Sequence, residues 1–307
     1  MEGLVLRIDA KVCHVDVAGT THILPLRGRL FEKCTNNEAR PIAVGDRVMV
    51  TLADGGGAID EVLPRTTRLA RRKAGDDDKR EQVIAANVTL VMVMASIRDP
   101  KFQPELVDRI LAGAEREHIP AILTITKVDR DKHGVAEDWA EMYRDIGYDS
   151  FVTCVIKGKE THESLDMLRE LLHENVTVIT GASGVGKSSL INTLIPGLNL
   201  RIGSIGRIRQ GKHTTSHTQL IPLPGGGHVL DTPGIRSFGL QNLEPLDLAF
   251  CFPDIKEFVH KCAFRNCTHT VEPDCAVLPA AEENLIAQSR YVSYTLMLRD
   301  LIGEPKE

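Results

Sequence analysis

The sequence has no long apolar run. Nothing in its 307 residues approaches the ~18 consecutive apolar residues of a membrane-spanning helix. The N-terminal stretch MEGLVLRIDAKV also lacks the basic segment followed by an apolar segment that marks a secretory signal. These absences argue against a membrane-spanning or secreted protein, and we expect the chain in the cytoplasm.

A surplus of positive charge is missing as well. Lys and Arg number 37 against 42 Asp and Glu, so the formal net charge is −5. Bulk charge therefore offers nucleic acid no attraction, and any nucleic-acid site has to be a local patch. Internal repeats and low-complexity segments are also missing, and a content of 42% hydrophobic and 26% charged residues is typical of a chain with a buried core. A chain of this length predicts two or three domains.

Residues 1–68 show no helical period. Apolar and polar positions alternate in part of VLRIDAKVCHVDV, and THILPL and IAVGDRVMVTL follow with Gly and Asp turns between them. Short strands of this kind predict a small β-barrel. The pattern alone fits an oligonucleotide-binding (OB) barrel and an SH3-like barrel equally well.

Residues 69–84 form a charged segment. The basic residues at its start and just before it are Arg65, Arg68, Arg71, Arg72 and Lys73. Three aspartates, 76–78, follow them. One interpretation is a solvated linker. The other is an arm that contacts phosphates beside the barrel.

The pattern changes to alternating strands and helices over residues 85–243. Buried apolar strands such as NVTLVMVMAS and PAILTITKVD alternate with helical stretches such as PELVDRILAGAEREH. Such alternation predicts an α/β domain with a mostly parallel sheet covered on both faces. Residues 244–307 are predicted to be helical around a cysteine-rich stretch.

The stretch GASGVGKS at 181–188 matches the phosphate-loop pattern G-x-x-x-x-G-K-[ST]. A strand precedes it and the helical pattern SSLINTLI overlaps its end, which is the context that this motif requires. The backbone N–H groups of such a loop face phosphate oxygens, Lys187 neutralises the β- and γ-phosphates and is a catalytic candidate, and Ser188 is a Mg²⁺ ligand. The expected nucleotide contacts are Gly181, Ala182, Ser183, Gly184, Val185, Gly186, Lys187, Ser188 and Ser189.

The stretch DTPG at 231–234 follows the strand pattern HVL, about 40 residues after the phosphate loop. At that distance Asp231 is expected to hold Mg²⁺ through water, and Gly234 to offer its N–H to a γ-phosphate.

The stretch TKVD at 126–129 ends an apolar strand and has the spacing of the guanine-reading N-K-x-D motif, with Thr126 in the place of Asn. Asp129 can accept hydrogen bonds from guanine N1–H and the exocyclic amine, and Lys127 can lie along the purine face, beside Val128. Adenine lacks that pair of donors, so a buried carboxylate discriminates against it.

TKVD precedes the phosphate loop by about 50 residues, whereas the base reader of common GTPases follows it. A parallel sheet with close termini tolerates being cut and rejoined at an exposed loop. The motif order therefore predicts a circularly permuted GTPase domain.

RQGKHTTSHT at 209–218 occupies the place of a switch loop. A threonine hydroxyl there can complete the Mg²⁺ shell, and we favour Thr215 over Thr214. Ile235 follows DTPG, where many GTPases have a glutamine that orients the attacking water. His213 is the nearest substitute, and we predict it as the catalytic residue that orients this water.

The stretch CAFRNCTHTVEPDC has three thiols and one imidazole within a short span. Such soft ligands suit a closed tetrahedral Zn²⁺ site. The alternative is a group of unligated core cysteines. The predicted ligands are Cys262, Cys267, His269 and Cys275.

Together these motifs resemble the ribosome small subunit-dependent GTPases of the RsgA (YjeQ/YloQ) family over essentially the full length. The resemblance also rests on GKHTTSH, DTPGIRSFGL and RYVSY, and on the order of the cysteines and the histidine. It implies an OB barrel, a permuted GTPase domain and a C-terminal zinc domain, with one structural Zn²⁺, and Mg²⁺ bound with GTP.

The resemblance further implies a monomer that binds the small (30S) ribosomal subunit and its rRNA, assists late maturation of that subunit, and hydrolyses GTP faster in its presence. Two positions depart from the family pattern: Thr126 replaces Asn, and Thr89 replaces the usual Asp. The motif that closes over the base is expected near residues 153–155.

Two other functions fit parts of the sequence. An RNA-binding assembly scaffold that binds GTP with little turnover is compatible with Ile235. A P-loop kinase or ATPase is compatible with the phosphate loop, but TKVD and DTPG argue against it.

Overall fold

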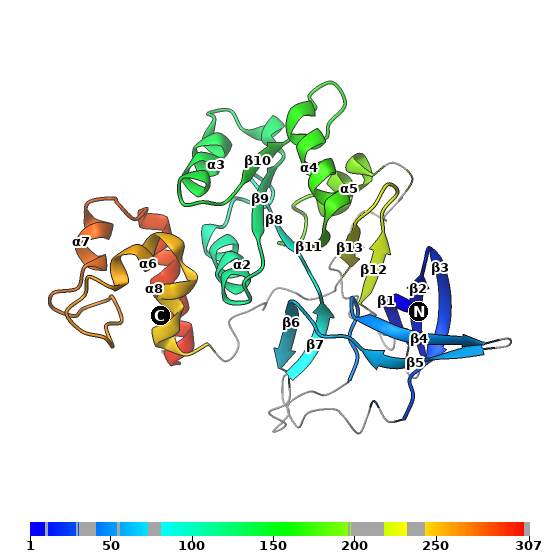
Figure 1. The fold of residues 1–307 in the computed structure, drawn as a ribbon. Helices are drawn as coiled ribbons and strands as arrows, with labels where there is room; N and C mark the ends of the chain where they lie inside the picture. The colour runs from blue at the N-terminus through cyan, green and yellow to red at the C-terminus, as the bar shows by residue number, and fades with distance from the viewer. Residues whose placement is uncertain are drawn as a thin grey trace. The chain divides into compact units, whose positions relative to one another are not determined.

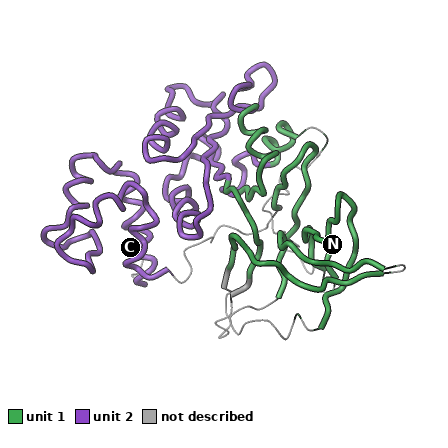
Figure 2. The backbone as a smooth tube through the Cα atoms, viewed as in Figure 1, with its two compact units in different colours: residues 1–91, 166–179, 188–235 green, residues 92–165, 180–187, 236–307 purple. Residues whose placement is uncertain are grey.

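The computed structural model describes residues 1–9, 12–28, 30, 41–53, 56–72, 81–195, 197, 218–231 and 243–303. Two compact units make up the chain (Figure 2). The first contains residues 1–91, 166–179 and 188–235, and the second contains residues 92–165, 180–187 and 236–307. Each unit is therefore assembled from segments that are far apart in the sequence.

The first unit begins with antiparallel strands (Figure 1). They are β1 (Glu2–Asp9), β2 (Val12–Val17), β3 (Thr20–Pro25), β4 (Arg47–Ala53) and β5 (Gly56–Val62). β2 pairs with β1 and β3, and β4 pairs with β1 and β5. Alternate residues of these strands turn inward, as the sequence predicts, and Val5, Val15 and Ile59 lie in their shared core.

Two strands pair in the charged segment, for which the sequence predicts either a linker or a phosphate-contacting arm. β6 (Arg68–Arg72) and β7 (Glu81–Ala86) pair antiparallel, and residues 73–80 between them lie outside the described part. Just before it, Arg65 makes a two-pronged ion pair with the fully buried carboxylate of Asp46, at 2.7 and 2.9 Å. The guanidinium of Arg65 is thus part of the packing of this unit and not of a phosphate-contacting arm.

The same unit continues with strands from the middle of the chain. β11 (Val176–Gly181) pairs parallel with β13 (His228–Asp231), and β12 (Gln219–Pro222) pairs antiparallel with β13. β12 also pairs with β1, through Arg7 and Gln219. The N-terminal strands are therefore joined through β1 to the sheet that contains β11, β12 and β13.

The second unit has a β10–β9–β8 strand order, with helices between the strands. Its strands are β8 (Leu90–Ser96), which is buried throughout and starts at the end of the first unit, β9 (Ala121–Thr126) and β10 (Ser150–Thr153), which is parallel to β9. α2 (Pro104–Arg116) and α3 (Val135–Asp145) lie between them in sequence. Pro104 begins α2, a position where its missing N–H has no helical partner to lose.

The C-terminal part of the second unit is helical around an irregular loop (Figure 1). Its helices are the 3₁₀-helix η3 (Pro245–Cys251), α6 (Pro253–Val259), α7 (Val277–Glu282) and α8 (Gln288–Ile302). Phe252, Ile255 and Tyr294 belong to one core with the cysteines of the loop. Over its described residues the molecule is a mixed α/β fold with a helical C-terminal part, as the sequence predicts.

Candidate nucleotide-binding site and metal centre

The phosphate loop leaves the end of β11 at a glycine that no other residue can replace. Gly181 has φ +145°, and a Cβ there would lie 2.0 Å from the carbonyl oxygen of Met94 on β8. Gly184 and Gly186 also have positive φ, at +83° and +100°. These conformations favour glycine, and they let the loop curl before helix α5 (Lys187–Leu194) begins.

Lys187 lies at the start of α5 with its ammonium held by the loop. Its Nζ donates to the carbonyl oxygens of Gly181 and Ala182, at 2.9 and 2.7 Å. Lys187 is buried, and Ser188 beside it is buried too. The loop therefore places a positive charge and a hydroxyl where a phosphate and its cation would need them.

The TKVD motif is joined to the phosphate loop in space. The hydroxyl of Thr126 donates to the carbonyl oxygen of Val185 at 2.5 Å and lies 3.2 Å from that of Ala95. Lys127, in a left-handed conformation, donates from Nζ to the carbonyl oxygen of Gly184 at 2.6 Å. Thr126 thus ties β9 to the loop through a hydroxyl, in the place where the family pattern has an amide.

Lys127 also bridges to a segment that sequence reasoning did not single out. Its Nζ donates to the carbonyl oxygen of Asp99, in the stretch after β8. Burial, followed by the charge of Arg130, lowers the pKa of Lys127. No sequence signal identified Asp99, because its backbone oxygen makes the contact.

Asp129 is contacted by Cys154, in the stretch that follows β10. The Cys154 thiol donates to Asp129 Oδ1 at 3.6 Å, and the Cys154 N–H donates to Thr161 Oγ1 at 3.1 Å. The carboxylate is about nine-tenths buried, and Arg130 Nε lies 4.0 Å from Oδ2. The stretch 153–155, expected to close over the base, therefore does reach the predicted base reader.

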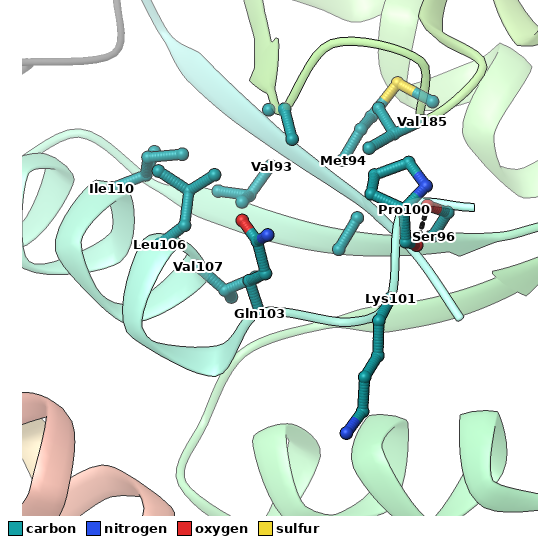
Figure 3. Close-up of a pocket in the computed structure, with 13 residues that line it drawn as sticks. Val93, Met94, Ser96, Pro100, Lys101, Gln103, Leu106, Val107, Ile110 and Val185 are labelled. Atoms are coloured by element: carbon teal, nitrogen blue, oxygen red, sulfur yellow. Dashed lines mark hydrogen bonds between the residues drawn. The ribbon is translucent and has the colours of Figure 1, made fainter. Parts of the chain in front are cut away.

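A small cavity lies under the phosphate loop (Figure 3). It is lined by Val93, Val107 and Val185 among others and has a volume of about 10 Å³, room for at most one water molecule. At its edge Ser96 donates a hydrogen bond to the carbonyl oxygen of Pro100 at 2.7 Å, which ties down the segment after β8. The cavity is packing space and not a ligand site.

Part of the predicted site falls outside the described residues. These residues are His213, Thr214, Thr215, Gly234 and Ile235, together with the side chain of Asp231. The proposed catalytic histidine and the second Mg²⁺ ligand therefore stay predictions.

The four predicted metal ligands do lie together. The ligand atoms of Cys262, Cys267, His269 and Cys275 are all within 4.8 Å of one another. His269 Nδ1 is 3.5 Å from the sulfur of Cys262 and 3.6 Å from that of Cys275. Ligands bonded to one tetrahedral Zn²⁺ at about 2.0–2.3 Å have separations of this size.

Burial shifts the pKa of two of these groups. It raises the pKa of the Cys267 thiol to about 12, and metal binding would require that thiol to lose its proton. Burial lowers the pKa of His269, which keeps the imidazole neutral and available as a ligand.

The loop that carries His269 is held by its neighbours. Tyr291 and Tyr294 donate hydroxyl hydrogen bonds to the carbonyl oxygens of His269 and Thr268, at 2.8 and 2.9 Å. Burial alone would raise the pKa of Glu272, but hydrogen bonds from Thr268 and the loop amides lower it to about 2. RYVSY therefore supports the loop of residues 262–275, called the metal loop below, through its two tyrosine hydroxyls.

A buried ionic cluster was missed by sequence reasoning. Arg290 on α8 donates to Asp254 on α6 at 3.1 and 2.8 Å, and to Asp108 on α2 at 2.7 Å. Tyr143 on α3 donates to the same Asp108 oxygen at 2.8 Å, and the guanidinium lies 4.5 Å from the ring centre of Phe252. The helices before and after TKVD in the sequence, α2 and α3, thus share one polar cluster with α6 and α8.

Thr89, the second departure from the family pattern, has a structural role. Its hydroxyl donates to Asn175 Oδ1 at 2.8 Å and accepts from the Val176 N–H at 2.9 Å. It thereby links the start of β8 to the start of β11.

The contacts between TKVD and the GASGVGKS loop join two motifs that are typical of GTPases. The family model described as RsgA GTPase matches residues 62–241. The chain belongs to the RsgA GTPase family.

Curated relatives in this family match most of the chain. The small ribosomal subunit biogenesis GTPase RsgA of Chlorobaculum parvum is 39% identical over 277 residues, covering 87% of each chain. The protein of the same name from Chlorobaculum tepidum is 36% identical over 304 residues, covering 93% of this chain and 96% of its own.

Solved structures of the family have the same fold. YloQ, described as a circularly permuted GTPase, superposes with a TM-score of 0.73 at 30% identity, over 100% of this chain and 96% of its own. YjeQ from Thermotoga maritima gives a TM-score of 0.77 at 30% identity, over 99% of both. The permuted order predicted from TKVD and GASGVGKS agrees with these relatives. Among the described helices, none is long and apolar enough to cross a membrane.

Proposed function

We propose that this chain binds the small (30S) ribosomal subunit and assists its late maturation, hydrolysing GTP to GDP and phosphate with turnover that the subunit stimulates. The observation that carries the proposal is the hydrogen bond from Thr126 to Val185, which joins the TKVD motif to the GASGVGKS loop. The names of the curated relatives support the ribosomal part of it.

At the base end of the site, Asp129 accepts from guanine N1–H and the exocyclic amine. The Cys154 thiol donates to one of its oxygens and so orients the carboxylate. Lys127 holds the phosphate loop through the Gly184 carbonyl while its alkyl stem lies along the purine. An adenine base would leave the carboxylate without its donors, which is the reason for guanine selectivity.

At the phosphate end, the N–H groups of residues 181–189 surround the phosphates, and the ammonium of Lys187 neutralises the β- and γ-oxygens. Ser188 and Thr215 would hold Mg²⁺, with Asp231 through water, and the ion would neutralise charge on the phosphates. Gly234 offers its N–H to the γ-phosphate. His213 orients the attacking water.

The metal loop holds one structural Zn²⁺ in this proposal, on Cys262, Cys267, His269 and Cys275. Metal analysis of the purified chain should give about one zinc per chain, and chelation should unfold the helices around the loop first. A metal-free, reduced chain with an intact C-terminal part would contradict the zinc site and leave the GTP site untouched.

We further propose the domain plan that the family implies. Residues 1–68 form an OB barrel that contacts rRNA, residues 85–243 the GTPase domain, and residues 244–307 the zinc domain. The charged segment 69–84 lies between the first two. A monomer in the cytoplasm suits a protein whose partner is the ribosomal subunit.

The test is GTP turnover with and without isolated small subunits. The unmodified chain should turn over GTP faster with subunits. Lys187→Ala should weaken GTP binding about 10- to 100-fold, the size of one charge-assisted hydrogen bond. His213→Ala should slow stimulated turnover at nearly unchanged affinity, the pattern of an interaction made in the transition state. Subunit binding with no turnover in the unmodified chain would favour an assembly scaffold instead.

A further inference from the structure

A second cavity lies in the second unit, away from the phosphate loop. Its volume is about 440 Å³, within the range of small-molecule sites. One wall is the segment after β8, with Arg98 and Lys101, and the other is the stretch from Asp131 to Trp139. None of the phosphate-loop residues lines it, so the proposed GTP site does not account for it.

One wall of the cavity is aromatic. The rings of Phe102 and Trp139 stack with centroids 4.7 Å apart and planes 26° apart. Phe102 is buried and also contacts Tyr143, whereas Trp139 is only half-buried. The indole is therefore held firmly and keeps exposed surface at the cavity, as a platform for a planar base requires.

The exposed cations of the cavity have no acidic partner among the described residues, whereas its acids are engaged. The Asp99 carboxylate pairs with Arg130 at 2.5 Å, and Asp131 accepts from the backbone N–H of Ala136 at 2.6 Å. Arg98 and Lys101 are exposed, and Figure 3 shows Lys101 directed away from the small cavity under the phosphate loop. Arg130 balances the charge of Asp99, whereas Asp131 keeps its negative charge, so Arg98 and Lys101 leave one positive charge in excess, which favours an anionic ligand.

We infer that this cavity binds an unpaired nucleotide of an RNA strand, with the base on Trp139 and the flanking phosphates on Arg98 and Lys101. Stacking needs no particular base, and the cations follow the backbone, which is how single strands are bound without sequence preference. Two flexible surface cations without a glycine loop bind a free mononucleotide weakly. A strand makes further contacts elsewhere and raises the local concentration of the nucleotide. This second site goes beyond the proposed GTPase function and does not depend on hydrolysis.

Trp139 is the only tryptophan of the chain, so its fluorescence reports this cavity alone. The full chain is saturated with GDP and Mg²⁺ and titrated with a twelve-nucleotide oligouridylate or with UMP at equal nucleotide concentration. The oligonucleotide should quench the fluorescence to saturation, and UMP should not. Equal quenching by UMP would overturn the assignment to an RNA strand, and an oligonucleotide that binds without changing the fluorescence would overturn the site.

Substitutions identify the side chains that bind phosphate. Arg98→Gln with Lys101→Gln should weaken oligonucleotide binding about tenfold and reduce the salt slope by roughly 0.7 for each phosphate that the variant no longer neutralises. Lys132→Gln with Arg265→Gln also removes one lysine and one arginine, from exposed positions that do not line the cavity. This control variant should change neither the affinity for the oligonucleotide nor the salt slope. GDP affinity should stay the same in both variants. Full oligonucleotide affinity in the first variant would overturn the proposal.

Discussion

At the scale of single residues, two departures from the family pattern turn out to be compatible with the site. Thr126 keeps a bond to the phosphate loop with a hydroxyl, and Thr89 ties two strand starts together. The threonine side chain has one donor, its hydroxyl, where the asparagine amide has two N–H donors. Thr126 can therefore hold the Val185 carbonyl but has no second donor for another partner. The departure therefore concerns how firmly the loop is held, and it leaves the proposed role of Asp129 in base selection unchanged.

Replacing Thr126 tests that division of roles. Thr126→Val removes the hydroxyl at nearly constant shape, so GDP and GTP should both bind about fivefold more weakly, corresponding to roughly 1 kcal/mol for one hydrogen bond. Thr126→Ser keeps the hydroxyl and serves as the control. Equilibrium titration with a fluorescent GDP analogue measures the effect, and equal affinities for all three proteins would show that the bond to Val185 carries no binding energy.

Asp129 should determine which base is bound. Asp129→Asn should shift the preference from GTP toward xanthosine triphosphate, whose ring carries the complementary group, because each unpaired buried polar group costs about 1–3 kcal/mol. Competition between the two triphosphates in both proteins measures the shift. If the unmodified chain binds ATP and GTP equally, Asp129 does not read guanine.

At the scale of elements, two arginines of different burial join helices of the second unit through ion pairs. Arg290 on α8 is buried with Asp108 of α2 and Asp254 of α6. Arg109 of α2 and Asp300 of α8 pair at the surface, with their side chains 32% and 27% exposed. Both arginines join α2 to α8, but only the buried one leaves carboxylates in an apolar core when it is removed.

This difference in burial predicts that replacing the two arginines lowers the free energy of unfolding by unequal amounts. Arg290→Met should lower the free energy of unfolding of the second unit by about 3–5 kcal/mol, since it strands two buried carboxylates. Arg109→Ala should lower it by less than about 1 kcal/mol, because water screens an exposed pair. Urea unfolding followed by Trp139 fluorescence compares the two. Similar losses in both variants would mean that burial does not decide the strength of these pairs.

At the scale of the whole molecule, the N-terminal strands and the nucleotide-binding strands are parts of one unit. β1 pairs with β12, so deleting the N-terminal segment would uncover an edge of the sheet that contains β13. Binding to the ribosomal subunit is therefore better tested on the intact chain than on truncated forms.

The intact chain should bind isolated small subunits in a manner that depends on nucleotide and salt. A γ-phosphate that orders the switch loop should make the complex with a non-hydrolysable GTP analogue tighter than that with GDP. Because a chain of charge −5 must use local basic contacts, affinity should fall with salt by a log–log slope of roughly 0.7–0.9 per phosphate neutralised. Co-sedimentation across a salt series measures both, and equal affinity with the two nucleotides would argue against a GTP-controlled cycle.

The sequence by itself was sufficient to predict what local chemistry dictates. The GASGVGKS loop, the TKVD motif and the four candidate metal ligands each depend on particular residue types at short spacings, so the sequence alone predicts them and the permuted order of the two nucleotide motifs. The alternation of apolar strands and helices likewise predicts the α/β class, because each element shows its own period.

Only the tertiary structure decided which distant residues meet. It paired β6 with β7 in the charged segment, assigned Arg65 to the buried Asp46, and paired β1 with β12. It also gathered Arg290 with two aspartates from other helices. A partner far along the chain leaves no periodic signal in the sequence, since the contact depends on how whole elements pack and on the free energy of burying a charge with or without its counterpart.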